Sequence, residues 1–95
     1  MDKTEALQVL GEHLKGYRGR SYSDLSALVQ SKHVDALTAK AASGKEYHLE
    51  FSFFWDGKPD GDVRVIGSVC DGGWRCYFPL TESFIVSPEG VFVGE

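Results

Sequence analysis

The side chains with the highest intrinsic reactivity in this chain of 95 residues are those of its two cysteines, Cys70 and Cys76. A cysteine becomes a nucleophile when a neighbouring base or positive charge favours its thiolate. Because no histidine lies beside either cysteine in the sequence, we expect both side chains to be structural. The chain has no further cysteine and begins with Met1-Asp2-Lys3 rather than a secretory leader, which favours a reduced, cytoplasmic protein.

Acidic residues gather in one loop, DGKPDGD at residues 56–62. Asp56, Asp60 and Asp62 could bind a hard cation, but their spacing differs from that of an EF-hand and no glutamate closes the site. Aspartate, glycine and proline are also the residues that tight turns require. We therefore predict a turn here and no metal site.

The remaining sequence motifs offer little chemistry. His13, His33 and His48 fall in three different segments, without the spacing of metal ligands. No glycine pattern matches GxGxxG or a P-loop, and no GxSxG nucleophile elbow occurs. The sequence thus predicts no catalytic residue, no metal ligand and no cofactor, and it favours a non-enzymatic protein.

One basic and aromatic group lies early in the chain, formed by Lys15, Tyr17, Arg18, Arg20 and Tyr22. It could meet a phosphate or an acidic partner, yet three positive charges in an acidic chain are also an ordinary solvated surface. With 10 basic and 14 acidic residues, the net charge of −4 argues against nucleic-acid binding. No apolar run suggests a membrane segment.

The elements that position these residues begin with strict alternation of apolar residues over 46–80. Such alternation is typical of strands that bury one face, and it predicts strands at 47–55, 63–70 and 74–78. The inward residues are Tyr47, Leu49, Phe51, Phe53, Trp55, Val63, Val65, Gly67, Val69, Trp74, Cys76 and Phe78.

The register of these strands follows from keeping the apolar faces together. It sets Trp55 against Val63, and a two-residue Gly72-Gly73 loop sets Val69 against Cys76. Cys70 and Cys76 then lie on opposite faces, so we expect two free thiols, with Cys70 labelled faster than Cys76.

The flanking segments complete an α+β fold. An apolar stripe at helical spacing predicts a helix over 3–17, and Ser21 or Ser23 caps a second, shorter helix that runs through Val29. A weaker strand at 33–42 buries either Leu37, Ala39 and Ala41 or Val34 and Ala36, depending on its loop. Residues 84–86 and 91–93 are predicted to form a terminal hairpin around Ser87-Pro88-Glu89-Gly90.

We predict one domain, residues 1–95, in which two N-terminal helices pack on one face of an antiparallel meander of about four strands with a C-terminal hairpin.

The other face of that sheet would have no helix over it. Its apolar, aromatic and arginine residues are typical of protein interfaces, and the predicted interface is formed by Phe54, Arg64, Ile66, Arg75 and Tyr77. The sequence therefore favours a non-enzymatic protein that acts by protein–protein interaction, as an adaptor, inhibitor, immunity-type or regulatory protein. We expect it to form a homodimer or to bind another protein, through this face or through an edge strand. The alternative is a small-ligand binder or modest enzyme with a cleft between helices and sheet, near Trp55, Trp74 and the 56–62 loop.

The C-terminal half of the chain also carries a recognisable pattern. The strings FWDGKPDGDVRVIGS, DGGW and PLTESF, with the ending SPEGVFVGE, resemble a group of short bacterial proteins described as hypothetical. The resemblance implies a bacterial origin. It implies no activity and no site residue.

Overall fold

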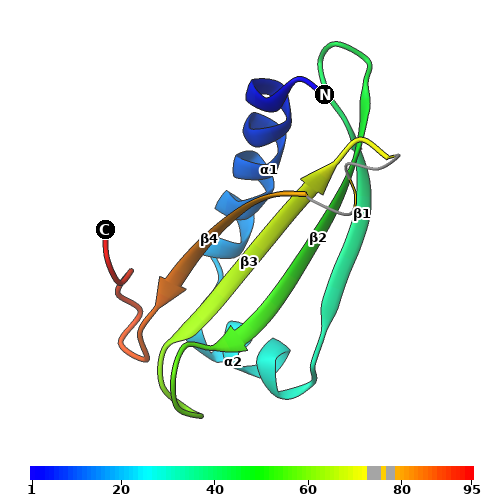
Figure 1. The fold of residues 1–95 in the computed structure, drawn as a ribbon. Helices are drawn as coiled ribbons and strands as arrows, with labels where there is room; N and C mark the ends of the chain where they lie inside the picture. Colours follow the sequence, from blue (N-terminus) through cyan, green and yellow to red (C-terminus); the bar gives the residue numbers. More distant parts are fainter. Residues whose placement is uncertain (73–75, 77–78) are drawn as a thin grey trace.

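The structure, a computed structural model, describes residues 1–72, 76 and 79–95. Its elements are α1 (Lys3–Arg18), α2 (Tyr22–Gln30), β1 (Val34–Lys40), β2 (Glu46–Trp55), β3 (Val63–Cys70) and β4 (Leu80–Val86). The four strands form one antiparallel sheet in the order β1-β2-β3-β4 (Figure 1). The predicted α+β meander is confirmed.

Both helices begin at side-chain caps. The Asp2 carboxylate accepts a hydrogen bond from the Glu5 backbone N–H at 3.1 Å, and the Ser21 hydroxyl accepts one from the Asp24 N–H at 3.1 Å. Ser21, rather than Ser23, is therefore the cap of α2. The buried residues of α1 are Ala6, Leu10, Leu14 and Tyr17, and α2 buries Leu25. This is the apolar stripe that three- and four-residue spacing predicts.

The pairing of β2 with β3 confirms the predicted register. Trp55 pairs with Val63, and the Asp56 N–H donates to the Asp62 carbonyl at 2.7 Å across the loop. On the other side of β2, the Ala41 N–H donates to the Lys45 carbonyl at 2.8 Å, which leaves a three-residue loop. That loop settles the face of β1, so Leu37, Ala39 and Ala41 pack toward the core.

The core lies between the helices and the inner face of the sheet. Helix α1 packs on β3 and β4, and α2 packs on β2 and β3. Figure 1 shows both helices behind the sheet, and no helix of the described residues covers its near face. Gly67 lies at the centre of the contact, where a Cβ atom would come within 2.8 Å of Leu10 Cδ1. The missing side chain lets α1 approach the sheet closely.

The partner of β3 differs from the prediction. Val69 pairs with Leu80 rather than with Cys76, so β4 runs from Leu80 to Val86 and includes the first arm of the predicted terminal hairpin. Four of the five residues of the predicted strand at 74–78 lie outside the described part of the chain. Pairing β3 with residues 80–86 still keeps apolar residues together, because Phe84 and Val86 are buried on the inner face.

The C-terminal segment turns back along β4. The Gly90 N–H donates to the Ser87 carbonyl at 2.8 Å, and Val86 forms an isolated bridge with Phe92. Gly90 has a φ of 82°, which glycine adopts without strain. The end of the chain is held by Arg18, whose guanidinium binds the Glu95 carboxylate at 2.7 and 2.9 Å. The predicted hairpin therefore forms against the edge of the sheet.

Within residues 1–72, 76 and 79–95, no helix has both the length and the apolar character needed to cross a membrane.

Candidate functional site

The outer face of the sheet, opposite the helices, carries a group of neighbouring apolar side chains. Val34 and Phe54 are 52% and 50% exposed, while Ile66 and Ile85 are half-buried. Strand pairing places Val34, Ser52 and Ile66 in one row across β1, β2 and β3, and Phe54, Arg64 and Ile85 in the next row across β2, β3 and β4. We refer to Val34, Phe54, Ile66 and Ile85 as the outer patch.

Arg64 is the single charged residue in these two rows, and its charge is neutralised within the chain. The Arg64 Nε and Nη2 atoms donate to Asp56 Oδ1 at 3.0 and 2.9 Å. Asp56 lies at the start of the loop after β2, directly beyond Phe54, so the pair forms along the edge of the outer patch. Binding a partner here requires no removal of an unpaired charge from water.

Three of the five predicted interface residues are brought together, since Phe54 and Arg64 are cross-strand partners and Ile66 lies two positions further along β3. Arg75 and Tyr77 lie outside the described residues. Sequence reasoning missed Val34 and Ile85. Val34 was missed because the face of β1 was left open, and Ile85 because β4 was assigned to a separate hairpin.

A hollow of about 500 Å³ adjoins the outer patch at one edge of the sheet. It forms where β1 stops pairing with β2, at Val34 and Ser52, while β2 continues to Trp55. Its walls include Val29 from the end of α2, together with Phe53 and Trp55. The alternative reading of the sequence placed a cleft near Trp55, and this hollow lies there. Trp74 is outside the described residues.

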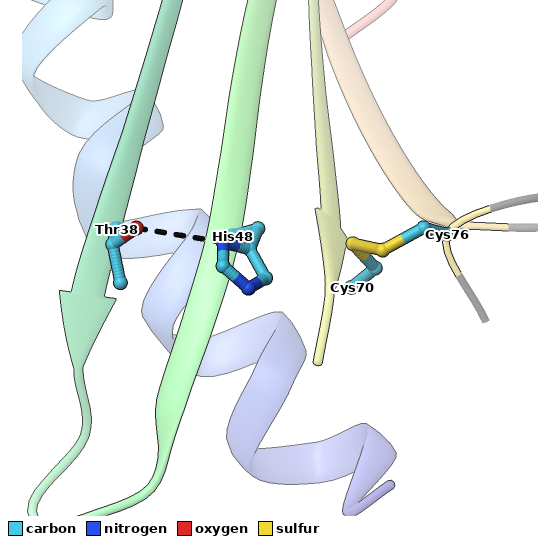
Figure 2. The surroundings of a disulfide bond; sticks show 4 residues. All are labelled: Thr38, His48, Cys70 and Cys76. Carbon is cyan, nitrogen blue, oxygen red and sulfur yellow. Dashed lines mark hydrogen bonds between the residues drawn. A yellow bond between two sulfur atoms is a disulfide. The ribbon is translucent and has the colours of Figure 1, made fainter. Parts of the chain in front are cut away.

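The two cysteines form a disulfide rather than two free thiols (Figure 2). Cys70 ends β3 and is only 8% exposed, whereas Cys76 lies outside the strands and is exposed. Cys70 is on the outer face, as the register predicts. The expectations that it is an accessible free thiol and that Cys76 is in the core are wrong. The error follows from the pairing of β3 with residues 80–86, which removes Cys76 from the inner face.

The disulfide lies at the other end of the outer face from the outer patch. His48 is the cross-strand partner of Cys70, and its Nδ1 atom lies 3.4 Å from the Thr38 hydroxyl oxygen. Both cysteines, His48 and Glu50 line a hollow of about 480 Å³ on this face. Figure 2 shows the imidazole of His48 between Thr38 and Cys70. A histidine thus faces the cysteine pair, although none is adjacent in sequence.

The basic and aromatic group of residues 15–22 is used for internal contacts. Arg18 binds Glu95 and lies over the rings of Phe84 and Phe92, at 4.7 and 5.0 Å from their centroids. The Tyr22 hydroxyl donates to the Gly61 carbonyl at 2.7 Å. These contacts support the reading of an ordinary structural surface over that of a phosphate site.

A hydrogen-bonded network ties α1 to the edge strand β1. The Tyr17 hydroxyl donates to Asp35 Oδ2 at 2.5 Å, and His33 Nε2 lies 2.5 Å from Asp35 Oδ1. Burial and the hydrogen bond to Asp35 raise the pKa of Tyr17. The hydrogen bond from Tyr17, followed by that from His33, lowers the pKa of Asp35 against the opposing effect of burial. The network ties the edge of the sheet to α1. His33 also lines the hollow of about 500 Å³ beside Trp55.

The acidic loop 56–62 and His13, which the sequence offered as possible metal ligands, do not come together in one site. Asp56 is bound to Arg64, so the 56–62 loop is closed by an ion pair and the backbone bond between Asp56 and Asp62. His13 bonds the Val9 carbonyl on α1 at 3.0 Å. In the described part of the chain, no three histidine, cysteine, aspartate or glutamate side chains gather as they would around a metal ion.

Comparison with protein-family models, curated proteins and solved structures finds no match to this chain. The resemblance to a group of short bacterial proteins stays a prediction.

Proposed function

We propose that this protein is a non-enzymatic interaction module that forms a homodimer through its outer sheet face, as a regulatory, inhibitor or adaptor protein would. The observation that carries the proposal is the outer patch, because its two most exposed members, Val34 and Phe54, are large apolar side chains on neighbouring strands. A few isolated apolar residues on a surface need no explanation, but apolar residues from four adjacent strands suggest a partner.

The area of the face is small for a specific interface, so we expect a weak and reversible dimer. Four strands spaced by about 4.8 Å and about seven residues long at about 3.4 Å each give a face of about 19 by 24 Å. Two such faces bury about 900 Å² in projection, which is close to the lower limit of about 1,000 Å² for a specific interface. A reversible dimer with a Kd of about 1–100 μM is the corresponding expectation.

Charge and symmetry favour a second copy as the occupant. The Arg64 and Asp56 charges cancel within each chain, so two outer patches can meet without repulsion between them. A two-fold axis through the patch would place Phe54 and Ile66 of both copies in one apolar layer, as in sheets packed about 10 Å apart. The net charge of −4 opposes association at long range, and added salt screens that repulsion.

The setting we propose is the bacterial cytoplasm, on the grounds of the sequence resemblance and the small number of cysteines. Disulfides in that compartment are usually transient rather than permanent.

The test is the effect of Ile66→Lys on the mass in solution. Sedimentation equilibrium from about 5 μM to about 1 mM spans the expected Kd. We expect the wild-type protein to approach the dimer mass as concentration rises. Ile66→Lys places an unpaired charge in the middle of the outer patch and should give a monomer at every concentration, with an unchanged circular dichroism spectrum.

The matched control is Gln8→Lys, which adds the same charge on the exposed side of α1. It should dimerise like the wild type. A dimer of unchanged affinity in Ile66→Lys would move the interface to an edge strand or the terminal hairpin. A wild-type protein that is monomeric at 1 mM (about 1,000 times a micromolar Kd) would remove the homodimer. It would leave a heterologous protein partner, or the small-ligand alternative with the hollow beside Trp55 as its site.

A further inference from the structure

The two residues of the Cys70–Cys76 disulfide differ in their access to solvent. Cys70 is 8% exposed at the end of β3, and Cys76 is exposed outside the strands. An external thiolate must approach a disulfide along the S–S axis and from the side of the sulfur that it attacks. Access therefore favours attack on Cys76, with Cys70 as the leaving group.

His48 lies across the β2–β3 strand pair from Cys70, the cysteine that would be the leaving group. His48 is directly across from Cys70 in the antiparallel pair, so both side chains project from the same face with Cβ atoms about 5 Å apart. The Thr38 hydroxyl lies 3.4 Å from Nδ1 of the ring. The Nε2 atom lies 3.9 Å from the position of a Cβ atom on Gly72, which places that edge of the ring beside the backbone two residues after Cys70.

The space next to the disulfide admits a small molecule. The hollow of about 480 Å³ has both cysteines, His48, Glu50 and Pro79 in its wall. Pockets for small ligands range from about 300 to about 1,000 Å³. A thiol of the size of a tripeptide is therefore of a suitable size for this hollow.

The bond restrains the unfolded chain less than a long-range disulfide would. The two cysteines are only 6 residues apart in sequence, and a disulfide that closes a short loop constrains the unfolded chain least. Cys70 is already held in place as the last residue of β3. An exposed cysteine residue, a histidine across the strand pair and an adjoining hollow distinguish this disulfide from a buried structural one.

We propose that Cys70–Cys76 is a site of thiol–disulfide exchange at which an external thiolate attacks the Cys76 sulfur. A bond forms between the incoming sulfur and Cys76, and the Cys70–Cys76 bond breaks with its electron pair on Cys70. The Cys70 thiolate then takes a proton from the His48 imidazolium or from water. A second thiolate attacks the mixed disulfide at the incoming sulfur, so two external thiols are oxidised to one disulfide and both cysteines are reduced. This proposal does not rest on the proposed dimer.

Glutathione is the probe for the first step. The folded protein is exposed to reduced glutathione, the reaction is stopped by acid, and the product is digested and mapped by mass spectrometry. We expect the mixed disulfide on Cys76 in large excess over Cys70. Equal labelling or labelling of Cys70 would overturn the assignment. A dithiol such as dithiothreitol should reduce the same bond without an accumulating adduct, which distinguishes a dithiol partner from a small monothiol.

The folded state must itself be the reactant. The exchange rate should stay constant as urea is raised through concentrations that leave the protein folded, because no unfolding is needed. A rate that follows the unfolded fraction, or no reaction until the protein unfolds, would mean a structural disulfide and would reject the proposal.

The role of His48 is tested with His48→Gln, which keeps a polar side chain of similar length. We expect exchange to slow by about threefold or more at neutral pH, while the urea midpoint and the preference for Cys76 stay the same. The control is His13→Gln, since His13 lies on α1 and bonds the Val9 carbonyl, away from the outer face. An unchanged rate in His48→Gln, or an equal loss in His13→Gln, would remove His48 from the reaction.

Discussion

Gly67 is the position at which the packing of α1 on the sheet can be tested most sharply. An alanine Cβ there would lie 2.8 Å from Leu10 Cδ1 and 2.9 Å from Phe51 Cε1, whereas ordinary van der Waals contacts begin at 3.4 Å. Leu10 and Phe51 are both fully buried, so neither side chain can turn out into solvent. Gly67→Ala must therefore displace α1 or push an aromatic ring out of its rotamer.

The magnitude follows from these contacts. Adding a methyl group to a filled core costs about 1–3 kcal/mol. Replacing glycine restricts the unfolded chain and returns about 0.4–1 kcal/mol. Because both contacts are closer than 3.0 Å, we take the upper part of the overpacking range, about 2–3 kcal/mol. The free energy of unfolding should thus fall by about 1–2.6 kcal/mol, a substantial part of the 5–15 kcal/mol that is typical of proteins.

Urea denaturation followed by circular dichroism measures this loss. Ser68→Ala, at the next position and on the outer face, is the control and should change the unfolding free energy by less than about 0.5 kcal/mol. In a Leu10→Ala background the added methyl should cost about 1 kcal/mol less, because its closest neighbour is gone. A Gly67→Ala protein as stable as wild type, or an equal cost in both backgrounds, would refute the reasoning.

The remaining predictions concern the faces of β2. Phe51→Ala removes a fully buried ring and should lower the unfolding free energy by about 3–5 kcal/mol, while Glu50→Ala on the outer face should change it little. Equally damaging substitutions in a urea titration would mean that the faces are misassigned. Burial and the hydrogen bond to Glu5 raise the pKa of Tyr47 to about 12. Because the folded pKa is above the unfolded value of about 10, the stabilisation is complete below pH 10 and is lost as the pH rises from about 10 to about 12. Thermal melts across that range should fall more steeply for the wild type than for Tyr47→Phe, and parallel curves would contradict the assignment.

The pairing of β2 with β3 could be predicted from the sequence because period-two alternation excludes any odd slip, and the turn residues between Asp56 and Asp62 choose among the remaining registers. A slip by one residue would turn Phe51 and Phe53 outward, so Trp55 had to pair with Val63. The helices were predictable for the same kind of reason, since the buried stripe of α1 and the cap at Ser21 are local signals.

The partner of β3 could not be predicted in this way. Residues 74–78 and residues 80–86 both offer alternating apolar positions after β3, and alternation alone does not choose between them. Choosing the nearer segment placed Cys76 in the core and hid the disulfide. Two cysteines that flank a five-residue segment containing two glycines could have signalled a disulfide-closed loop. The pairing of His48 with Cys70 follows once β2 and β3 are in register.

Dimerisation through the outer patch can be observed residue by residue with methyl NMR of isoleucine. The chain has only two isoleucines, Ile66 and Ile85, and both are members of the outer patch. In protein labelled at the isoleucine δ1 methyl groups, a dilution series therefore gives two signals from the proposed interface and none from elsewhere. We predict that both signals shift with concentration along one dimerisation curve, which matches the change in sedimented mass. Signals that stay fixed while the mass doubles, or while the mass remains that of a monomer, would contradict the claim.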